Sequence, residues 1–281
     1  MTGFDEVRRS LEQTVANGYA PGIVAGIRHR DRTEVVATGR LSFEPDAAPI
    51  TADTPFRIAS LGKIVLGVLA LQLHDEGVFA LDDPLERWLP EFAEPRVLRA
   101  PDAPIHDTLA AERGIRMRDL VTMTAGFAFP WPDTPLTHAM AEAAVASGPR
   151  PAQLPPEEFV SRLAALPLAR QPGERFSYDT AADVLSIALP RAAGSSLADL
   201  VRTRIATPLA LGSTAFHVSP PVVLPTPYRA GEGGALEVAR DLEGAWERPP
   251  AMESLRGGLV STVPEFLRIL TAIADDELLT P

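Results

Sequence analysis

A serine and a lysine at helical spacing are the residues of this chain best suited to nucleophilic chemistry. Of the 26 lysine and arginine residues, Lys63 alone is a lysine, and it follows Ser60 by three positions. A guanidinium keeps its proton in a protein, whereas a buried ammonium can become a neutral base. Residues three apart lie on the same face of a helix. The pair therefore predicts a serine nucleophile beside a lysine base.

The segment that carries this pair has the pattern of a buried helix. Residues 60–76 contain an apolar run from Ile64 to Leu71, followed by Gly77, which predicts a helix that is apolar on nearly all of its faces. A capping box would place Glu or Gln three residues after Ser60, where the helix dipole favours a negative charge, but a cation stands there. A second interpretation stays open, in which Ser60 is a plain N-cap and the lysine is incidental.

Composition excludes several classes of protein. With 281 residues, of which 46% are hydrophobic, the chain can form one large domain or two, and its net charge of −11 argues against a nucleic-acid partner. It has no cysteine, and its five histidines have no metal-ligand spacing, so we expect no metal and no cofactor. The apolar runs are too short to cross a bilayer and the first residues lack the pattern of an export signal. These features predict a cytoplasmic protein without membrane contact.

Periodicity and turn residues predict a mixture of helices and one hairpin. Residues 4–16 have helical spacing and end at Asn17-Gly18, and residues 23–29 and 33–38 are expected to pair around a short polar loop. Residues 93–113 are rich in proline, alanine and charge, which indicates a surface excursion. Further helices are predicted over residues 116–122, 157–166, 181 onward, 197–205 and 262–274, with capping boxes at Thr180/Asp183 and Thr262/Glu265.

A cluster of aromatic residues lies among prolines in the middle of the chain. Phe127, Phe129 and Trp131 fall within residues 127–135. Such a cluster can line a pocket for the acyl group of a substrate, and it can equally form an ordinary core beneath a loop. Both interpretations stay open at the level of the sequence.

Five segments, taken in order, carry a family resemblance: residues 56–63, 81–84, 116–127, 171–178 and 257–262. In this order and spacing the chain resembles the serine β-lactamase and penicillin-binding-protein superfamily, most closely its class C-like carboxylesterase branch, from about residue 4 to the last residue. The resemblance implies an α/β (α+β) fold of the β-lactamase/transpeptidase type, with an antiparallel sheet flanked by helices and a mainly helical lobe. It also implies one catalytic domain over residues 1–281, with lobes of 1–82 plus 255–281 and of 83–254, and a cleft between them.

The resemblance also implies roles for individual residues. Ser60 would form a covalent ester with the substrate, and Lys63 would accept its proton or hold a neighbouring base in its charged form. Tyr178 would be a second general acid/base, although a loop tyrosine can also simply fill the core. Substrate contacts would come from a further set of residues, namely Thr180, Phe127, Trp131, Gly257 and Gly258.

Two departures from the family pattern bear on function. The second motif is commonly Tyr-x-Asn, but here it is Tyr178-Asp179-Thr180, and Asn17 is the only asparagine. The missing carboxamide favours an ester substrate over a β-lactam. The third motif, Lys-Thr-Gly or its variants, cannot be found, so one oxyanion donor and the strand that would pair with the N-terminal hairpin are missing. We therefore expect a chain that is incomplete at its C-terminus, or one that a second chain carrying these strands completes.

The leading hypothesis is a serine hydrolase that acts on small carboxylic esters, with transfer to an acceptor other than water as a variant. A β-lactamase or D-amino-acid peptidase, which would take an amide substrate, is the first alternative. The second is a catalytically inactive binding module, a hypothesis that the absent strand makes credible.

Overall fold

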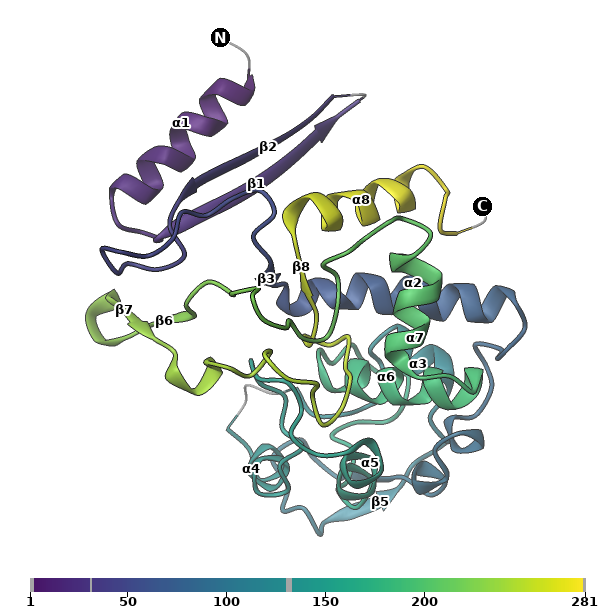
Figure 1. Cartoon of the computed structure of the whole chain (residues 1–281). Helices are drawn as coiled ribbons and strands as arrows, with labels where there is room; N and C mark the ends of the chain where they lie inside the picture. The colour runs from purple at the N-terminus through teal and green to yellow at the C-terminus, as the bar shows by residue number, and fades with distance from the viewer. Residues whose placement is uncertain (1–2, 31, 130–132, 280–281) are drawn as a thin grey trace.

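The computed structural model describes residues 3–30, 32–129 and 133–279. At one end of the molecule, helix α1 (Gly3–Ala16) and the hairpin of β1 (Gly22–His29) and β2 (Arg32–Gly39) lie beside helix α8 (Val263–Ala274) (Figure 1). The hairpin contacts both helices, α1 mainly through β2 and α8 through β1. The helix predicted for residues 4–16 and the predicted hairpin are thus confirmed.

Glycine allows the close contact between the hairpin and α8. An added Cβ at Gly26 would lie 2.8 Å from Cγ1 of Val263, closer than side-chain carbons normally approach. The start of α8 is capped as predicted, since Glu265 N donates to Thr262 Oγ1 at 3.3 Å. The Glu265 carboxylate does not complete the capping box, because it accepts from the backbone N–H of Gly212 and Ser213 instead.

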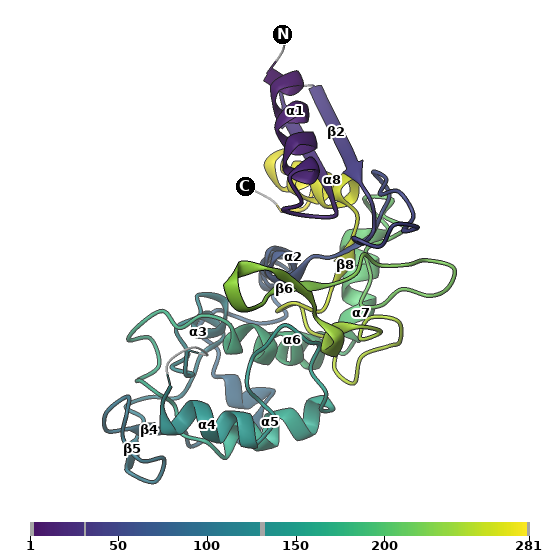
Figure 2. The same ribbon diagram turned by 90° about the vertical axis from the view of Figure 1, so that its left-hand side faces the viewer.

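Helix α2 (Gly62–Asp75) crosses the centre of the molecule between this layer and a helical lobe (Figures 1 and 2). A 3₁₀ turn, Ala59–Leu61, precedes it and holds Ser60, whose side chain caps neither element. The plain N-cap interpretation of Ser60 is therefore wrong. At Gly62 an added Cβ would lie 2.6 Å from the carbonyl oxygen of Leu255, so glycine is required for the segment around Leu255 to approach the start of α2.

The helical lobe lies on the other side of α2. Its most buried member is α6 (Thr180–Ala193), whose residues 180–189 are all buried and which packs against α2. One apolar core runs through α2, α6 and α8. The lobe contains the further helices α3 (Met117–Val121), α4 (Pro135–Glu142), α5 (Pro156–Ala164) and α7 (Leu197–Val201), a π-helical turn (Arg202–Ala206), and 3₁₀ turns at Leu85–Arg87, Pro90–Phe92, Glu232–Gly234 and Arg240–Leu242.

The strands pair in separate antiparallel two-stranded sheets. Besides β1–β2, the pairs are β3 (Phe56–Arg57) with β8 (Val260–Ser261), β4 (Arg96–Leu98) with β5 (Thr108–Ala110), and β6 (Tyr228–Ala230) with β7 (Leu236–Val238). The predicted combination of antiparallel strands, flanking helices and a helical lobe is confirmed. Across residues 3–30, 32–129 and 133–279, no third strand pairs with the hairpin, and the edge of β1 that faces away from β2 is unpaired.

Two local expectations were wrong, and one element was missed. Residues 93–113 are not only a surface excursion, because β4 buries Val97 and Leu98 against the core. Thr180 and Asp183 form no capping box, since the N-cap of α6 is Asp179 and makes no side-chain capping bond. The β6–β7 hairpin was not expected at all.

Among the described residues no single helix is long and apolar enough to cross a bilayer. Helix α6 and residues 197–206 together have the length and composition of a membrane span, but the chain bends by 82° between them.

Candidate active site

The predicted serine–lysine pair is in contact. Lys63 Nζ lies 3.1 Å from Ser60 Oγ, and it donates a hydrogen bond of 2.8 Å to the carbonyl oxygen of Arg256. Ser60 is exposed, whereas the Lys63 side chain is only 10% exposed. A reachable hydroxyl beside a largely buried amine is the arrangement that an activated serine nucleophile requires.

Tyr178 completes the predicted catalytic group. Its ring centroid lies 4.5 Å from Lys63 Nζ, so the amine sits over the face of the phenol ring. The preceding residue holds the loop in place, because Ser177 N donates to Met123 O at 2.7 Å and Ser177 Oγ donates to Phe127 O at 2.6 Å. These two hydrogen bonds anchor the loop that carries Tyr178, so its ring lies against Lys63 although the two residues are far apart in the sequence.

A carboxylate that the sequence did not single out touches the same amine. Asp179 Oδ1 forms an ion pair with Lys63 Nζ at 2.8 Å, and it accepts no hydrogen bond from any other described residue. The Asp179 backbone has φ of 95°, a strained value for a residue with a side chain, which persists only where the surroundings enforce it. The sequence feature that could have identified Asp179 is an acidic residue next to Tyr178 in a chain with a single lysine.

Behind Asp179 lies a buried network centred on Arg256. Its Nε donates to Asp183 Oδ2 at 2.7 Å, and its Nη1 lies 3.6 Å from Asp179 Oδ2. Ser254 Oγ donates to the other oxygen of Asp183 at 2.6 Å. Burial raises the pKa of Asp183, while Arg256 and the bond from Ser254 act in the opposite direction. Cations and carboxylates therefore alternate from Lys63 to Asp183, which balances the charge beneath the nucleophile.

Comparisons with known proteins show the family to which this chain belongs. The Beta-lactamase family model matches residues 7–281. The chain belongs to the beta-lactamase family. It is 31% identical to Protein Rv1367c of Mycobacterium tuberculosis, over 97% of this chain and 67% of that protein. It is 29% identical to Esterase EstB of Burkholderia gladioli, over 80% of this chain and 58% of that protein.

Solved structures with a similar fold support the architecture described above. EstCE1, described as a hydrolase with promiscuous acyltransferase activity, superposes with a TM-score of 0.81 at 23% identity, covering 96% of this chain and 72% of its own. Unliganded simvastatin synthase (LovD) from Aspergillus terreus superposes with a TM-score of 0.79 at 21% identity, covering 100% of this chain and 70% of that chain. At these identities the likeness shows the β-lactamase-type fold.

The predicted substrate-binding residues fall at different distances from Ser60 and Lys63. Gly257 lies beside the nucleophile, since an added Cβ there would be 3.8 Å from the carbonyl carbon of Ala59. Gly258 instead allows a tight turn, because its Cβ would lie 2.5 Å from Ser254 O. Thr180 is fully buried, with Oγ1 3.4 Å from Ser147 Oγ, which argues against a direct substrate contact.

The aromatic candidates lie around a neighbouring cavity. Phe127 is buried and packs edge-to-face on Phe92 at 5.8 Å, but it also lines the cavity together with Phe129. Trp131 lies outside the described residues. Within the described part of the chain, no group of three histidine, aspartate or glutamate side chains could hold a metal ion.

Proposed function

We propose that this protein is a serine hydrolase that forms an acyl-enzyme on Ser60 and acts on small carboxylic esters. The observation that carries the proposal is the 3.1 Å contact between Lys63 Nζ and Ser60 Oγ in a chain of the beta-lactamase family. Proteins similar to this chain are named as an esterase and as acyltransferases.

In the proposed mechanism Lys63 enters the reaction as a neutral amine and becomes charged when it takes the proton of Ser60. A neutral amine has two N–H groups and one lone pair. The Arg256 carbonyl and the Asp179 carboxylate, each 2.8 Å from Nζ, can only accept, so the lone pair is left for the Ser60 hydroxyl. When Ser60 gives up its proton, the resulting ammonium is stabilised by the carboxylate beside it.

The reaction then runs through two transfers. Ser60 Oγ attacks the carbonyl carbon of the ester as its proton passes to Lys63, and the leaving alkoxide departs with a proton from Lys63 or from the Tyr178 hydroxyl. Water then attacks the carbonyl carbon of the acyl-enzyme and gives one proton to the group that protonated the alkoxide, Lys63 or Tyr178. The acid is released as Ser60 Oγ takes its proton back from Lys63. An alcohol in place of water yields a new ester, in keeping with relatives named as methylbutanoyltransferases.

The family's Tyr-x-Asn motif has a carboxamide at position 180, where this chain has the fully buried Thr180, and the absence of that amide group favours an ester over a β-lactam or a D-peptide. The test uses 4-nitrophenyl butyrate and a chromogenic cephalosporin, together with mass spectrometry after treatment with a fluorophosphonate. We expect ester hydrolysis and a single adduct on Ser60, both absent in Ser60→Ala. A clear preference for the cephalosporin would favour a β-lactamase, and a protein that is neither labelled nor active would be a binding module.

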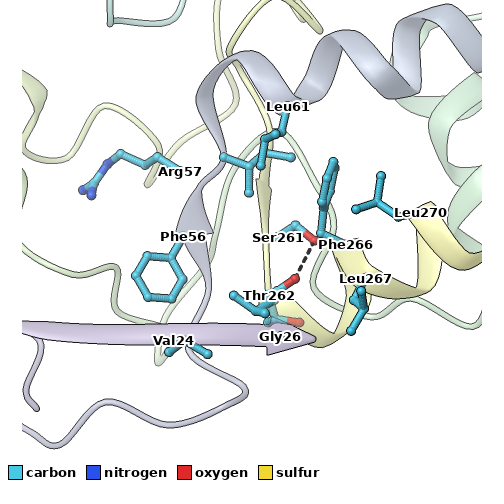
Figure 3. Close-up of a pocket in the computed structure, with 12 residues that line it drawn as sticks. Val24, Gly26, Phe56, Arg57, Leu61, Ser261, Thr262, Phe266, Leu267 and Leu270 are labelled. Carbon is cyan, nitrogen blue, oxygen red and sulfur yellow. Dashed lines mark hydrogen bonds between the residues drawn. The ribbon is translucent and has the colours of Figure 1, made fainter. Parts of the chain in front are cut away.

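We also propose that a further β-strand, from outside this sequence, completes the site along the open edge of β1. A cavity of about 340 Å³ follows this edge between β1, β3 and α8, lined by Val24, Phe56, Leu61, Phe266 and Leu270 (Figure 3). It reaches Leu61, the neighbour of Ser60, where a strand could supply a backbone N–H to the oxyanion. Protein isolated from its own cells should contain a longer polypeptide or a tightly bound second chain. Full activity of a 30.1 kDa species alone would contradict this.

A further inference from the structure

A second cavity lies next to the loop that carries Tyr178. It has a volume of about 600 Å³, within the range of small-molecule sites. Ser177, directly before Tyr178, is part of its wall, and the ring of Phe176 lies 6.4 Å from the ring of Tyr178. The cavity therefore begins at the residues that directly precede Tyr178 in the chain.

The walls of this cavity expose aromatic surface. Phe129 is 40% exposed and Phe176 is 60% exposed, while Phe127 and Leu136 form the buried part of the lining. Large aromatic side chains that face water beside a cavity mark a surface that an apolar ligand can cover. The cavity thus suits a molecule with an aromatic or aliphatic body.

The charge at this cavity differs from that of the rest of the protein. The chain has a net charge of −11, yet the charged residues in the described lining are two arginines, Arg170 and Arg175. Arg170 already pairs with Glu174 at 3.4 Å. Arg175 makes no hydrogen bond or ion pair with any other residue in 3–30, 32–129 or 133–279, so its guanidinium is available to a ligand.

We propose that this cavity binds the non-reacting part of the substrate, and that this part is an apolar group ending in a carboxylate held by Arg175. The inference rests on the proposed function, because it identifies the cavity as the substrate pocket of the Ser60 site. A guanidinium recognises a carboxylate through paired N–H donors, and Arg175 is exposed in the wall of the cavity beside its aromatic lining. The aromatic side chains supply affinity, and Arg175 selects the acid over a neutral analogue.

Calorimetric titration of the Ser60→Ala protein tests this binding without requiring turnover. The probes are 6-phenylhexanoate and 6-phenylhexanamide, which share the apolar body and differ in charge. We expect the carboxylate to bind more tightly than the amide by about fivefold to tenfold, the range of a partly exposed charge-assisted contact. Adding Arg175→Gln should remove this preference, whereas adding Phe176→Ala should weaken both ligands alike.

Arg30→Gln is the matched control, because it removes one exposed arginine from the hairpin loop and changes the net charge equally. It should keep the preference for the carboxylate. Equal binding of both probes to the Ser60→Ala protein, or a preference that survives Arg175→Gln in a folded protein, would overturn the proposal. Esterase activity is measured separately on the wild type, so failure of the proposed function and failure of this pocket give different results.

Discussion

Replacing Lys63 by arginine separates the charge of this residue from its ability to accept a proton. Lys63 Nζ contacts Ser60 Oγ at 3.1 Å and the oxygens of Arg256 and Asp179 at 2.8 Å each. An arginine keeps a cation beside the Asp179 carboxylate, but it does not deprotonate. Lys63→Arg should therefore keep most of the ion pairing and lose the base.

The magnitudes follow from these contacts. Loss of a general base lowers kcat/KM about 10²- to 10⁴-fold, which is about 2.7 to 5.4 kcal/mol of activation free energy. The larger guanidinium should lower the free energy of unfolding by about 1 to 3 kcal/mol through overpacking. Lys63→Met should lower it by about 3 kcal/mol, the lower end for a broken buried pair, because Arg256 still lies 3.6 Å from Asp179.

The assay combines hydrolysis of 4-nitrophenyl butyrate with urea denaturation of both variants. We expect both to be inactive and the arginine variant to be no less stable than the methionine variant. Fluorophosphonate labelling of Ser60 should slow in parallel with hydrolysis. If Lys63→Arg hydrolysed the ester at a near-native rate, Lys63 would act only through its charge and the base would have to be another group.

Three further outcomes are expected. Tyr178→Phe keeps the ring against Lys63 but removes the hydroxyl, so kcat should fall about 10²-fold with little change in KM. An unchanged kcat in steady-state kinetics would show that Tyr178 takes no part in the mechanism. Arg256→Met should lower the free energy of unfolding by about 3 to 5 kcal/mol because Asp183 is left buried and unpaired, and adding Asp183→Asn should restore part of it in a double-mutant cycle. The hydrogen bond to Arg204 lowers the pKa of Glu76 in the folded protein. This pair should therefore stabilise the fold above the unfolded pKa of about 4.3, and its contribution should be lost as the pH falls through the lower pKa of the folded state. Glu76→Gln should therefore cost less than about 1 kcal/mol at pH 7 and nothing at about pH 2 in thermal denaturation, since the carboxylate is half exposed.

The sequence by itself was sufficient for features that depend on neighbouring residues. The Ser60–Lys63 contact spans a single helical turn, so its spacing predicted the contact that the structure shows. The same holds for α1, for the hairpin and for the Thr262 cap of α8, because each depends on periodicity or on a turn a few residues long. Tyr178 was found through the resemblance of its segment to a family motif.

The tertiary structure alone decided the surroundings of the lysine. Asp179 and Arg256 come from segments far from Lys63 in the chain, and they meet only because α2, α6 and the segment around Leu255 pack against one another. Asp183 had the spacing of a capping box, but a buried carboxylate is stabilised far more by an arginine than by a helix N–H, so it pairs with Arg256. Local spacing encodes the nucleophile and its base, whereas the charges that balance them depend on long-range packing that no short stretch of sequence specifies.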